Sequence, residues 1–302
     1  MPNKKISLAI IQNNSEPGDY EGNIKSVEIF IEKIKNENVQ LVVLPELFAT
    51  GYSPNENIFN YGEKEDGKTL KWMKEKARSY NIHIGGGIPI YSKGNLYNRF
   101  YIVNPSGNLC GYAQKEFPES YCFKCNEGIF SIDTELGKIG VSICADCHFT
   151  SVVKKLQNYD IDILLMPHAW PTLKTENQDE TEFASKLVQL LKLPIAFANG
   201  IGKMEVMQGL MGKLMTPNKF KLRGKSCIIN SNGNIVASLS SEAGFIIGEV
   251  ELGKISDEKV KVPNFSGFIH NGSWLLRNII IPYDIWRGKK TYKKNLKKIN
   301  HV

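Results

Sequence analysis

The sequence contains no apolar run long enough to cross a membrane as a helix, which takes about 18 or more consecutive residues. The first apolar stretch, residues 6–11, is short and leads into Gln-Asn-Asn-Ser, without the small residues of a signal-peptide cleavage site. These absences predict a cytoplasmic protein without a membrane span. In that compartment its six cysteines are expected to be reduced.

Internal repeats and low-complexity linkers are also absent before about residue 253. A chain of 302 residues can bury a large core as one α/β unit. We therefore predict one compact domain over residues 1–252, followed by a C-terminal extension over residues 253–302.

Acidic residues are missing from the end of the chain, where Arg287 is followed by six lysines. These seven basic residues equal the formal net charge of +7, so the rest of the chain is close to neutral. A basic segment of this kind is usually a solvated or packed terminal arm, and we expect no nucleic-acid partner. The apolar and aromatic residues over 274–286 suggest an oligomer arm, with a lid over a neighbouring site or a weak membrane-surface element as alternatives.

Apolar runs and helical periodicities alternate along the chain, which is typical of an α/β fold. Strands are predicted at 6–12, 41–44, 82–90, 99–103, 109–114, 129–132, 139–144, 161–166, 194–199, 225–229, 235–239 and 244–250. Helices are predicted at 24–34, 70–80, 152–156 and 182–191. The triple glycine at 85–87 lacks the spacing of a phosphate-binding loop, so a bulge or a close strand approach is expected there.

Three reactive side chains each follow a predicted strand: Glu46, Lys115 and Cys144. A cysteine attacks as its thiolate, and a nearby carboxylate can take the thiol proton. A lysine ammonium favours the thiolate and stabilises the oxyanion that forms when an acyl carbon is attacked. The three residues therefore form a complete set for acyl transfer without a histidine.

The segments that carry these residues resemble the motifs of the nitrilase, or carbon-nitrogen hydrolase, superfamily. Residues 41–52, Leu-Val-Val-Leu-Pro-Glu-Leu-Phe-Ala-Thr-Gly-Tyr, are similar to its glutamate motif, and residues 137–146, Gly-Lys-Ile-Gly-Val-Ser-Ile-Cys-Ala-Asp, to its cysteine motif. Residues 111–115, Gly-Tyr-Ala-Gln-Lys, resemble the lysine motif, although an arginine often stands where Gln114 stands here. The resemblance implies a four-layer α-β-β-α sandwich, assembly into homodimers or larger oligomers, and no cofactor or metal.

By the same resemblance, Glu46 would be the general base, Lys115 the oxyanion-stabilising cation and Cys144 the nucleophile of a Glu-Lys-Cys triad. Many members have a second glutamate after the lysine. Glu127 matches the motif of this second glutamate best, and Glu119 is the rival candidate. If Glu127 has that role, Glu119 would contact the substrate. The remaining substrate-binding candidates are Tyr52, the backbone N–H of Ala145, His148, His168 and Trp170.

The chain also departs from the family pattern. His148 stands where an arginine is common, and the downstream Arg-Ala-x-Glu-Asn pattern is missing. True nitrilases usually carry Glu two residues after the nucleophile, so Asp146 favours a small amide or N-carbamoyl substrate over a nitrile. Alternatives are an acyltransferase or amide-forming enzyme with an amine acceptor, a nitrilase, and a catalytically silent scaffold.

The cysteine spacing allows a competing interpretation. Cys122-x-x-Cys125 and Cys144-x-x-Cys147 have the spacing of a four-cysteine zinc site, which would consume the proposed nucleophile. A regulatory disulfide between Cys144 and Cys147 or Cys122 is a further alternative. The predicted partners of Cys144 favour its role as a nucleophile.

Overall fold

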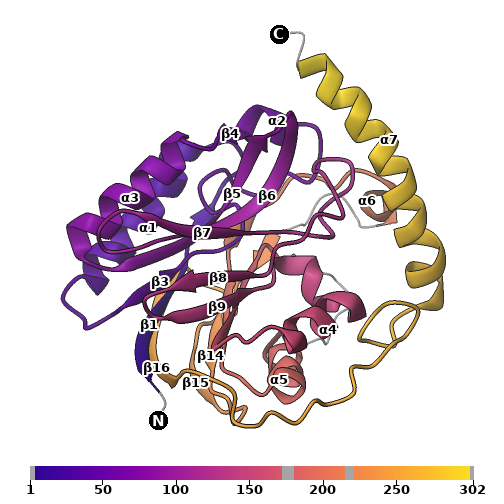
Figure 1. The fold of residues 1–302 in the computed structure, drawn as a ribbon. Coiled ribbons are helices and arrows are strands. Elements are labelled where there is room, and N and C mark those ends of the chain that lie inside the picture. Colours follow the sequence, from indigo (N-terminus) through magenta and orange to yellow (C-terminus); the bar gives the residue numbers. More distant parts are fainter. Residues whose placement is uncertain (1–3, 172–179, 215–220, 300–302) are drawn as a thin grey trace.

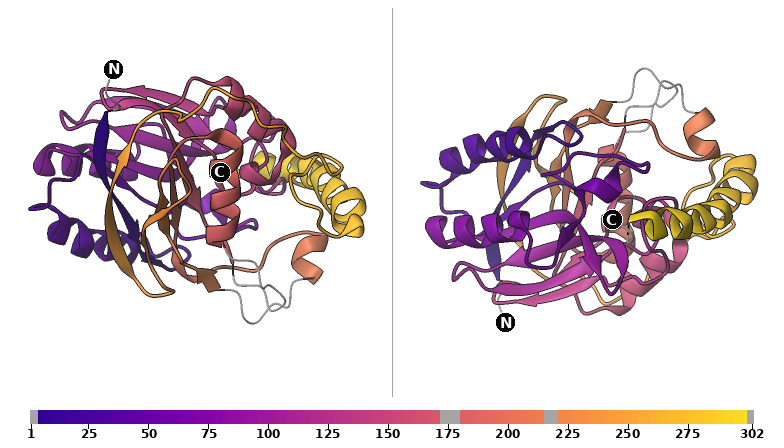
Figure 2. Two further views of the ribbon diagram at one scale, coloured as in Figure 1. Left: turned by 90° about the horizontal axis from the view of Figure 1, so that it is seen from below. Right: turned by 90° about the horizontal axis from the view of Figure 1, so that it is seen from above.

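The structure is a computed structural model that describes residues 4–171, 180–214 and 221–299. Its centre is a pair of β-sheets that face each other (Figures 1 and 2). The first sheet has the strand order β16-β1-β3-β5-β6-β7, with β4 paired to β5, and the second has the order β15-β14-β11-β10-β9-β8. A third, small sheet joins β13, β12 and β2.

The first sheet is parallel at its centre and antiparallel at its edges. Its strands are β1 (Lys5–Gln12), β3 (Leu41–Val43), β4 (Glu63–Lys64), β5 (His83–Ser92), β6 (Asn95–Val103), β7 (Leu109–Gln114) and β16 (Gly244–Glu251). Parallel strands covered on both faces need continuous apolar runs, and the buried runs of β1 and β3 meet that requirement.

The second sheet repeats this arrangement, because β9, β10 and β11 are parallel and the outer strands antiparallel. It contains β8 (Ser131–Thr134), β9 (Gly137–Val141), β10 (Ile163–His168), β11 (Ile195–Asn199), β14 (Cys227–Ile229) and β15 (Ile235–Ser238). The small sheet contains β2 (Asn14–Ser15), β12 (Ile201–Lys203) and β13 (Lys221–Arg223). These three short strands were not predicted from the sequence.

Helices cover the outer face of each sheet. The helices α1 (Tyr20–Ile34) and α3 (Lys68–Tyr80) pack on the first sheet, and α4 (Thr150–Asn158) and α5 (Glu180–Leu191) pack on the second. Between the sheets lies an apolar layer that includes Ile10, Val43, Val141 and Leu165. The predicted four-layer α-β-β-α sandwich is therefore confirmed (Figure 2).

The helix α1 illustrates how the sequence pattern produces these layers. Its buried residues Ile24, Val27, Ile31 and Ile34 recur every three or four positions and form one apolar stripe facing the sheet. The helix begins after Asp19, whose carboxylate accepts a hydrogen bond from the backbone N–H of Gly22 at 3.0 Å.

The glycines of β5 allow a close approach, as the sequence predicted. A Cβ atom at Gly87 would lie 2.8 Å from the backbone nitrogen of Leu47 and 2.9 Å from the Cα atom of Glu46. Those distances are shorter than a carbon side chain tolerates, so only glycine lets the loop after β3 lie against β5. This contact sets the position of Glu46.

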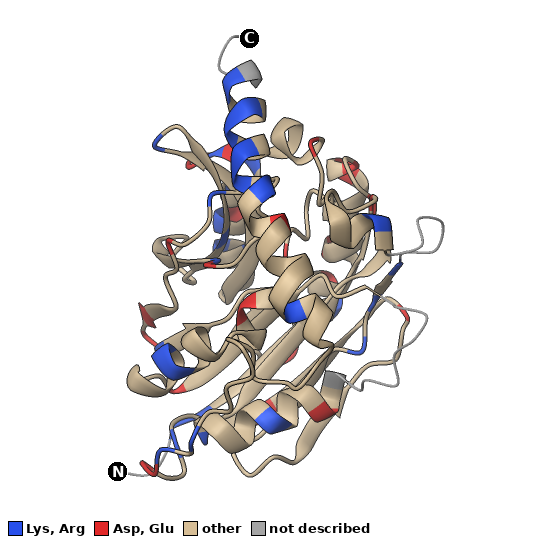
Figure 3. Cartoon of the chain, turned by 90° about the vertical axis from the view of Figure 1, so that its right-hand side faces the viewer, with Lys and Arg blue, Asp and Glu red and all other residues tan. Residues whose placement is uncertain are grey.

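The segment after residue 252 ends in a long helix that packs against the rest of the chain, and its division from a domain over residues 1–252 stays a prediction. A π-helical turn (Leu276–Ile280) leads into α7 (Ile281–Ile299), which lies beside the short helix α6 (Leu210–Leu214) (Figure 1). The short helix α2 (Ile58–Tyr61) also contacts α7, because the ring of Phe59 stacks with that of Tyr292 at a centroid distance of 5.9 Å. Figure 3 shows the Lys and Arg residues recurring along α7. Large apolar side chains are exposed at Trp274, Leu275, Ile279, Tyr283 and Trp286. The role of the extension as an oligomer arm stays a prediction.

Within the described ranges, no helix has both the length and the apolar character needed to span a membrane.

Candidate active site

Glu46 lies on the loop that follows β3, and its side chain is buried. Its Oε1 atom accepts hydrogen bonds from Lys115 Nζ and from Asn98 Nδ2, both at 2.7 Å. The next residue, Leu47, has φ of 52°, a left-handed conformation that costs free energy in a leucine and is typical of functional loops. The loop therefore holds the carboxylate in one fixed position.

Lys115 follows β7 and is the cation of this site. Its fully buried Nζ lies 2.7 Å from Glu46 Oε1 and 3.1 Å from Glu119 Oε1. Burial alone would lower the pKa of Lys115, but Glu119 and Glu46 together raise that pKa well above its usual value. Lys115 is therefore charged, and it balances two carboxylates that would otherwise be costly to bury.

The second oxygen of Glu46 is available for chemistry. No described residue forms a hydrogen bond with the buried Oε2 atom. Burial raises the pKa of Glu46, Lys115 lowers it, and Glu119 raises it further. A carboxylate with a raised pKa and a free oxygen is suited to accept and return a proton.

Cys144 begins the short 3-10 helix Cys144–His148 after β9 and has φ of 47°. The residue as a whole is partly exposed. Burial raises the pKa of the Cys144 thiol well above its usual value, and Glu46 and Glu119 raise it further. Lys115 and a hydrogen bond from the backbone of Ala169 act in the opposite direction. The resting form is therefore the thiol, with Lys115 and Glu46 close enough to influence its ionisation.

Glu119, rather than Glu127, is the second carboxylate in contact with Lys115. Glu119 lies within 3.1 Å of Lys115 Nζ and accepts a hydrogen bond of 2.5 Å from the Tyr52 hydroxyl. Glu127 instead accepts a hydrogen bond from the Tyr97 hydroxyl and lies 3.4 Å from Lys124 Nζ, with 46% of its side chain exposed. The sequence favoured Glu127 because its motif matched. The structure places it outside the buried cluster, since the loop after β7 turns Glu119 inward.

Two aspartates hold the loop that carries Glu119. The carboxylate of Asp146 accepts hydrogen bonds from the backbone N–H groups of Glu116 and Phe117 at 3.0 and 2.8 Å. Burial raises the pKa of Asp146 to about 7, although Lys115 and these two hydrogen bonds lower it. Asp146 therefore acts on the site through the loop backbone.

The second aspartate is Asp284 in α7. Its backbone carbonyl accepts a hydrogen bond from Ser120 Oγ at 2.8 Å, and its Oδ1 atom accepts one from the Tyr121 hydroxyl at 3.1 Å. The C-terminal helix thus anchors the residues next to Glu119.

The predicted histidines lie beside Cys144 in sequence or space but contact protein groups. His168 is fully buried, with Nδ1 3.0 Å from the Met166 carbonyl oxygen and Nε2 3.6 Å from Cys147 Sγ. His148 Nδ1 lies 2.6 Å from His270 Nε2. Burial lowers the pKa of His168 to about 3 and that of His148 well below its usual value, so both are neutral. Both rings are held by protein groups, and a role of His148 or His168 in binding substrate stays a prediction.

Trp170 is half-buried beside these rings. Its ring lies edge-on to His148 and is stacked with His168, at centroid distances of 4.9 and 5.7 Å. Its backbone N–H donates to Asn199 Oδ1 at 2.8 Å. The residue can form part of a pocket wall, as the sequence suggested.

The four-cysteine zinc site is not assembled in the structure. The thiols of Cys122, Cys125 and Cys147 each contact backbone carbonyl oxygens, of Asn55, Phe123 and Cys144 respectively. All six cysteines are free, so no disulfide involves Cys144. In the part of the chain that the structure describes, the four thiols do not gather into a group that could hold a metal.

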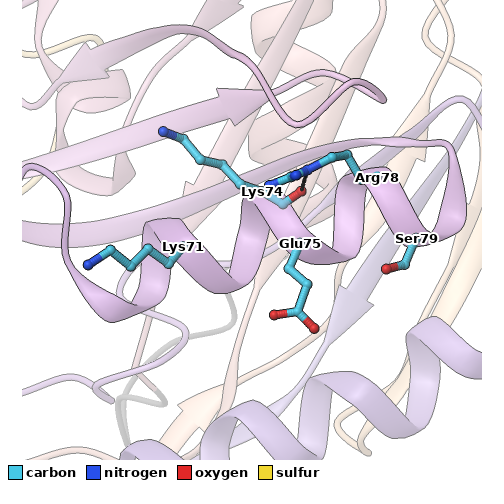
Figure 4. Close-up of a pocket in the computed structure, with 5 residues that line it drawn as sticks. All are labelled: Lys71, Lys74, Glu75, Arg78 and Ser79. Carbon is cyan, nitrogen blue, oxygen red and sulfur yellow. Dashed lines mark hydrogen bonds between the residues drawn. The ribbon is translucent and has the colours of Figure 1, made fainter.

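Two surface hollows lie away from this cluster. One of about 340 Å³ is lined by Lys71, Lys74, Glu75, Arg78 and Ser79, all on the outer side of α3 (Figure 4). Another is lined by residues of α4 and of the segment after Lys254. Neither hollow contains a residue of the Glu46, Lys115 and Cys144 cluster.

The family model described as carbon-nitrogen hydrolase matches residues 7–259. The chain belongs to the carbon-nitrogen hydrolase family. It is a hydrolase of the nitrilase superfamily, whose members described below include amidases.

Named relatives agree with this assignment. The chain is 25% identical to a 2-oxoglutaramate amidase from Bacillus subtilis over 276 residues, covering 86% of this chain and 96% of the relative. It is 23% identical to an omega-amidase from Homo sapiens, covering 88% and 95%. The structure of Saccharomyces cerevisiae Nit3, a nitrilase superfamily member, has the same fold with a TM-score of 0.70, at 24% identity and covering 83% and 91%.

Two supporting residues were not among the predicted site residues. Asn98 donates to Glu46 from the buried strand β6, and a polar residue inside an apolar strand was the available signal. Asp284 had no signal, because the residues that it holds beside Glu119, Ser120 and Tyr121, lie more than 160 residues earlier in the chain.

Proposed function

We propose that the protein hydrolyses the C–N bond of a small amide through a thioester on Cys144. The contact of Lys115 with both Glu46 and Glu119, next to the strand end that bears Cys144, carries this proposal. A buried ammonium held by two carboxylates is a preorganised positive charge, which stabilises an oxyanion without reorganisation during the reaction.

The first half-reaction forms the thioester. Glu46 takes the thiol proton as the sulfur of Cys144 attacks the carbonyl carbon, and the negative charge on the oxygen is stabilised by Lys115 and the backbone N–H of Ala145. The C–N bond then breaks as Glu46 returns the proton to nitrogen. Ammonia or an amine leaves, and the acyl group remains on sulfur.

The second half-reaction uses water. Glu46 removes a proton from water, the resulting hydroxide attacks the thioester carbon, and the C–S bond breaks. The sulfur leaves as a thiolate and regains its proton from Glu46, and the free acid departs. The free Oε2 atom of Glu46 supports this role because it can contact the incoming water.

The named relatives suggest which substrates to examine first. Two of them are amidases named for 2-oxoglutaramate and omega-amides. We therefore propose a small primary amide or N-carbamoyl compound. The carboxylate of Asp146 binds the backbone of the loop beside Lys115. Nitrilases usually carry a glutamate at this position, so we expect nitriles to be poor substrates.

The test is ammonia release by the full-length protein from 2-oxoglutaramate, other primary amides, N-carbamoyl amines and acids, and nitriles. We expect release from an amide or N-carbamoyl compound, and a loss of at least about 10³-fold in Cys144→Ala because the nucleophile is gone. The matched control, Cys125→Ala, should retain activity. Undiminished release by Cys144→Ala would contradict the proposal, and amine-dependent acyl transfer without hydrolysis would favour a transferase.

A further inference from the structure

A second group of reactive side chains lies at the opposite end of the strands from Cys144. A ring nitrogen of His83, the sulfur of Cys110 and a carboxylate oxygen of Glu135 all lie within 4.8 Å of one another. They come from β5, from β7 and from the turn between β8 and β9. The family motifs include none of these three residues.

Strand register brings these residues together. His83 pairs with Leu41 at the start of β3, whereas Glu46 lies beyond the end of β3. Val103 pairs with both Ile84 and Leu109, which places Cys110 level with the start of β5. The turn with Glu135 belongs to the other sheet. The cluster therefore joins the two sheets and is separate from the catalytic end.

The imidazole of His83 is oriented as a metal ligand requires. Its Nδ1 atom lies 3.1 Å from the carbonyl oxygen of Gln40, which favours the tautomer with the proton on Nδ1. The Nε2 atom then faces Glu135 Oε2 at 3.1 Å. In metal sites, a ligating histidine commonly donates its other N–H to a backbone carbonyl in this way.

The carboxylate of Glu135 is held from the other side. Its Oε1 atom accepts a hydrogen bond from Asn104 Nδ2 at 2.8 Å, which leaves Oε2 facing His83. Lys4 Nζ donates to the backbone carbonyl of Glu135 at 2.7 Å and not to its carboxylate.

We propose that His83, Cys110 and Glu135 bind a zinc ion, with water as the fourth ligand. Imidazole, thiolate and carboxylate are all zinc ligands, with bond lengths of about 2.0 to 2.3 Å, so tetrahedral ligands lie roughly 3.5 Å apart. Closing the group from 4.8 Å to that separation takes a shift of about 1 Å, within the reach of side-chain rotation. A bound ion would link the two sheets.

Binding is expected to depend on pH, because the thiol must lose its proton to bind the metal. One proton is released for each ion bound. The apparent affinity should therefore increase by about tenfold per pH unit near neutrality.

The test uses metal-free, full-length protein carrying Cys144→Ala, which removes the catalytic thiol as a competing ligand. Titration with Co²⁺ should produce a thiolate-to-metal absorption band, and Zn²⁺ should displace Co²⁺ at one ion per chain. Adding Cys110→Ser should abolish the band, and Glu135→Gln should weaken Zn²⁺ binding at least tenfold. Adding Cys125→Ser, the matched control, should leave both unchanged.

Thermal unfolding provides a second readout. Zn²⁺ should raise the Tm of the Cys144→Ala protein, because it binds the intact site of the folded chain and not the unfolded chain. The Tm of the protein that carries both Cys144→Ala and Cys110→Ser should stay unchanged. The proposal is overturned if no thiolate band forms, or if the band survives Cys110→Ser. The test does not substitute His83, because that residue is buried and its replacement can prevent folding. Glu135 is largely exposed, so Glu135→Gln is expected to fold.

Discussion

The two ends of the sandwich carry similar chemical groups in different surroundings. At the carboxyl ends of β3 and β9, the thiol of Cys144 lies near a lysine and two carboxylates that are buried or nearly so. At the opposite end, Cys110 lies near His83 and Glu135, whose side chain is 64% exposed. Strand β7 joins the two ends, since Cys110 is near its start and Lys115 follows its last residue.

The difference shows how burial decides what a carboxylate does. Burial raises the pKa of Glu46, whereas the exposed Glu135 has its pKa lowered to about 2 by hydrogen bonds. A carboxyl group of the first kind takes up a proton more readily than an exposed one. One of the second kind stays ionised and is suited to a cation.

The largest effect is expected at the buried cation. Lys115→Met leaves the carboxylates of Glu46 and Glu119 facing each other without a counter-charge, which should lower the free energy of unfolding by about 3–5 kcal/mol and abolish turnover. Lys4→Met at the opposite end, an exposed lysine, should change stability by less than about 0.5 kcal/mol. Urea unfolding of both variants measures this contrast. Equal stabilities would show that the buried ion cluster is not a structural requirement.

A smaller effect should separate the two glutamates. Glu119→Gln removes a charge that contacts Lys115, and we expect kcat/KM to fall by about 10²- to 10³-fold. Glu127→Gln alters a partly exposed pair with Lys124 and should change kcat/KM by less than about threefold. The measurement is steady-state ammonia release with a substrate identified as above. The reverse ranking would restore Glu127 as the second glutamate of the site.

The smallest effects concern pH, and the two ends should differ in sign. The fold raises the pKa of Asp146 from 3.8 to about 7, so its proton is held more tightly in the folded chain. The stability from this group is present below about pH 4 and is lost as the pH rises through 7. Glu135 has a lowered pKa, so its contribution is present above about pH 4.5 and is lost as the pH falls towards 2.

Thermal unfolding from pH 3 to 8 checks these signs. Asp146→Asn should lower the Tm less at pH 8 than at pH 4. At pH 8 the unsubstituted protein has already lost the stability that protonated Asp146 contributes at pH 4. Glu135→Gln should show the opposite trend, with its penalty largest above pH 5. A penalty for either variant that does not change with pH would mean that the fold does not perturb that carboxyl group.

Much of the architecture followed from local patterns. The apolar runs at β1, β3 and β10 and the helical periodicities of α1 and α3 each depend on residues close in sequence, and the structure has those elements where they were expected. Glu46, Lys115 and Cys144 were also recognisable, because each lies in a motif of contiguous residues that follows a strand. Chain order and local spacing are sufficient for such features.

Contacts between distant residues required the tertiary structure. Glu119 and Glu127 are both close to Lys115 in sequence, and only the path of the loop, held by Asp146 and Asp284, turns one of them onto the ammonium group. The grouping of His83, Cys110 and Glu135 depends on strand register and on how the two sheets face each other. The sequence by itself determined which side chains can react. Packing of the sheets and of the C-terminal helix decided which of them meet, because burial and distance belong to the folded chain.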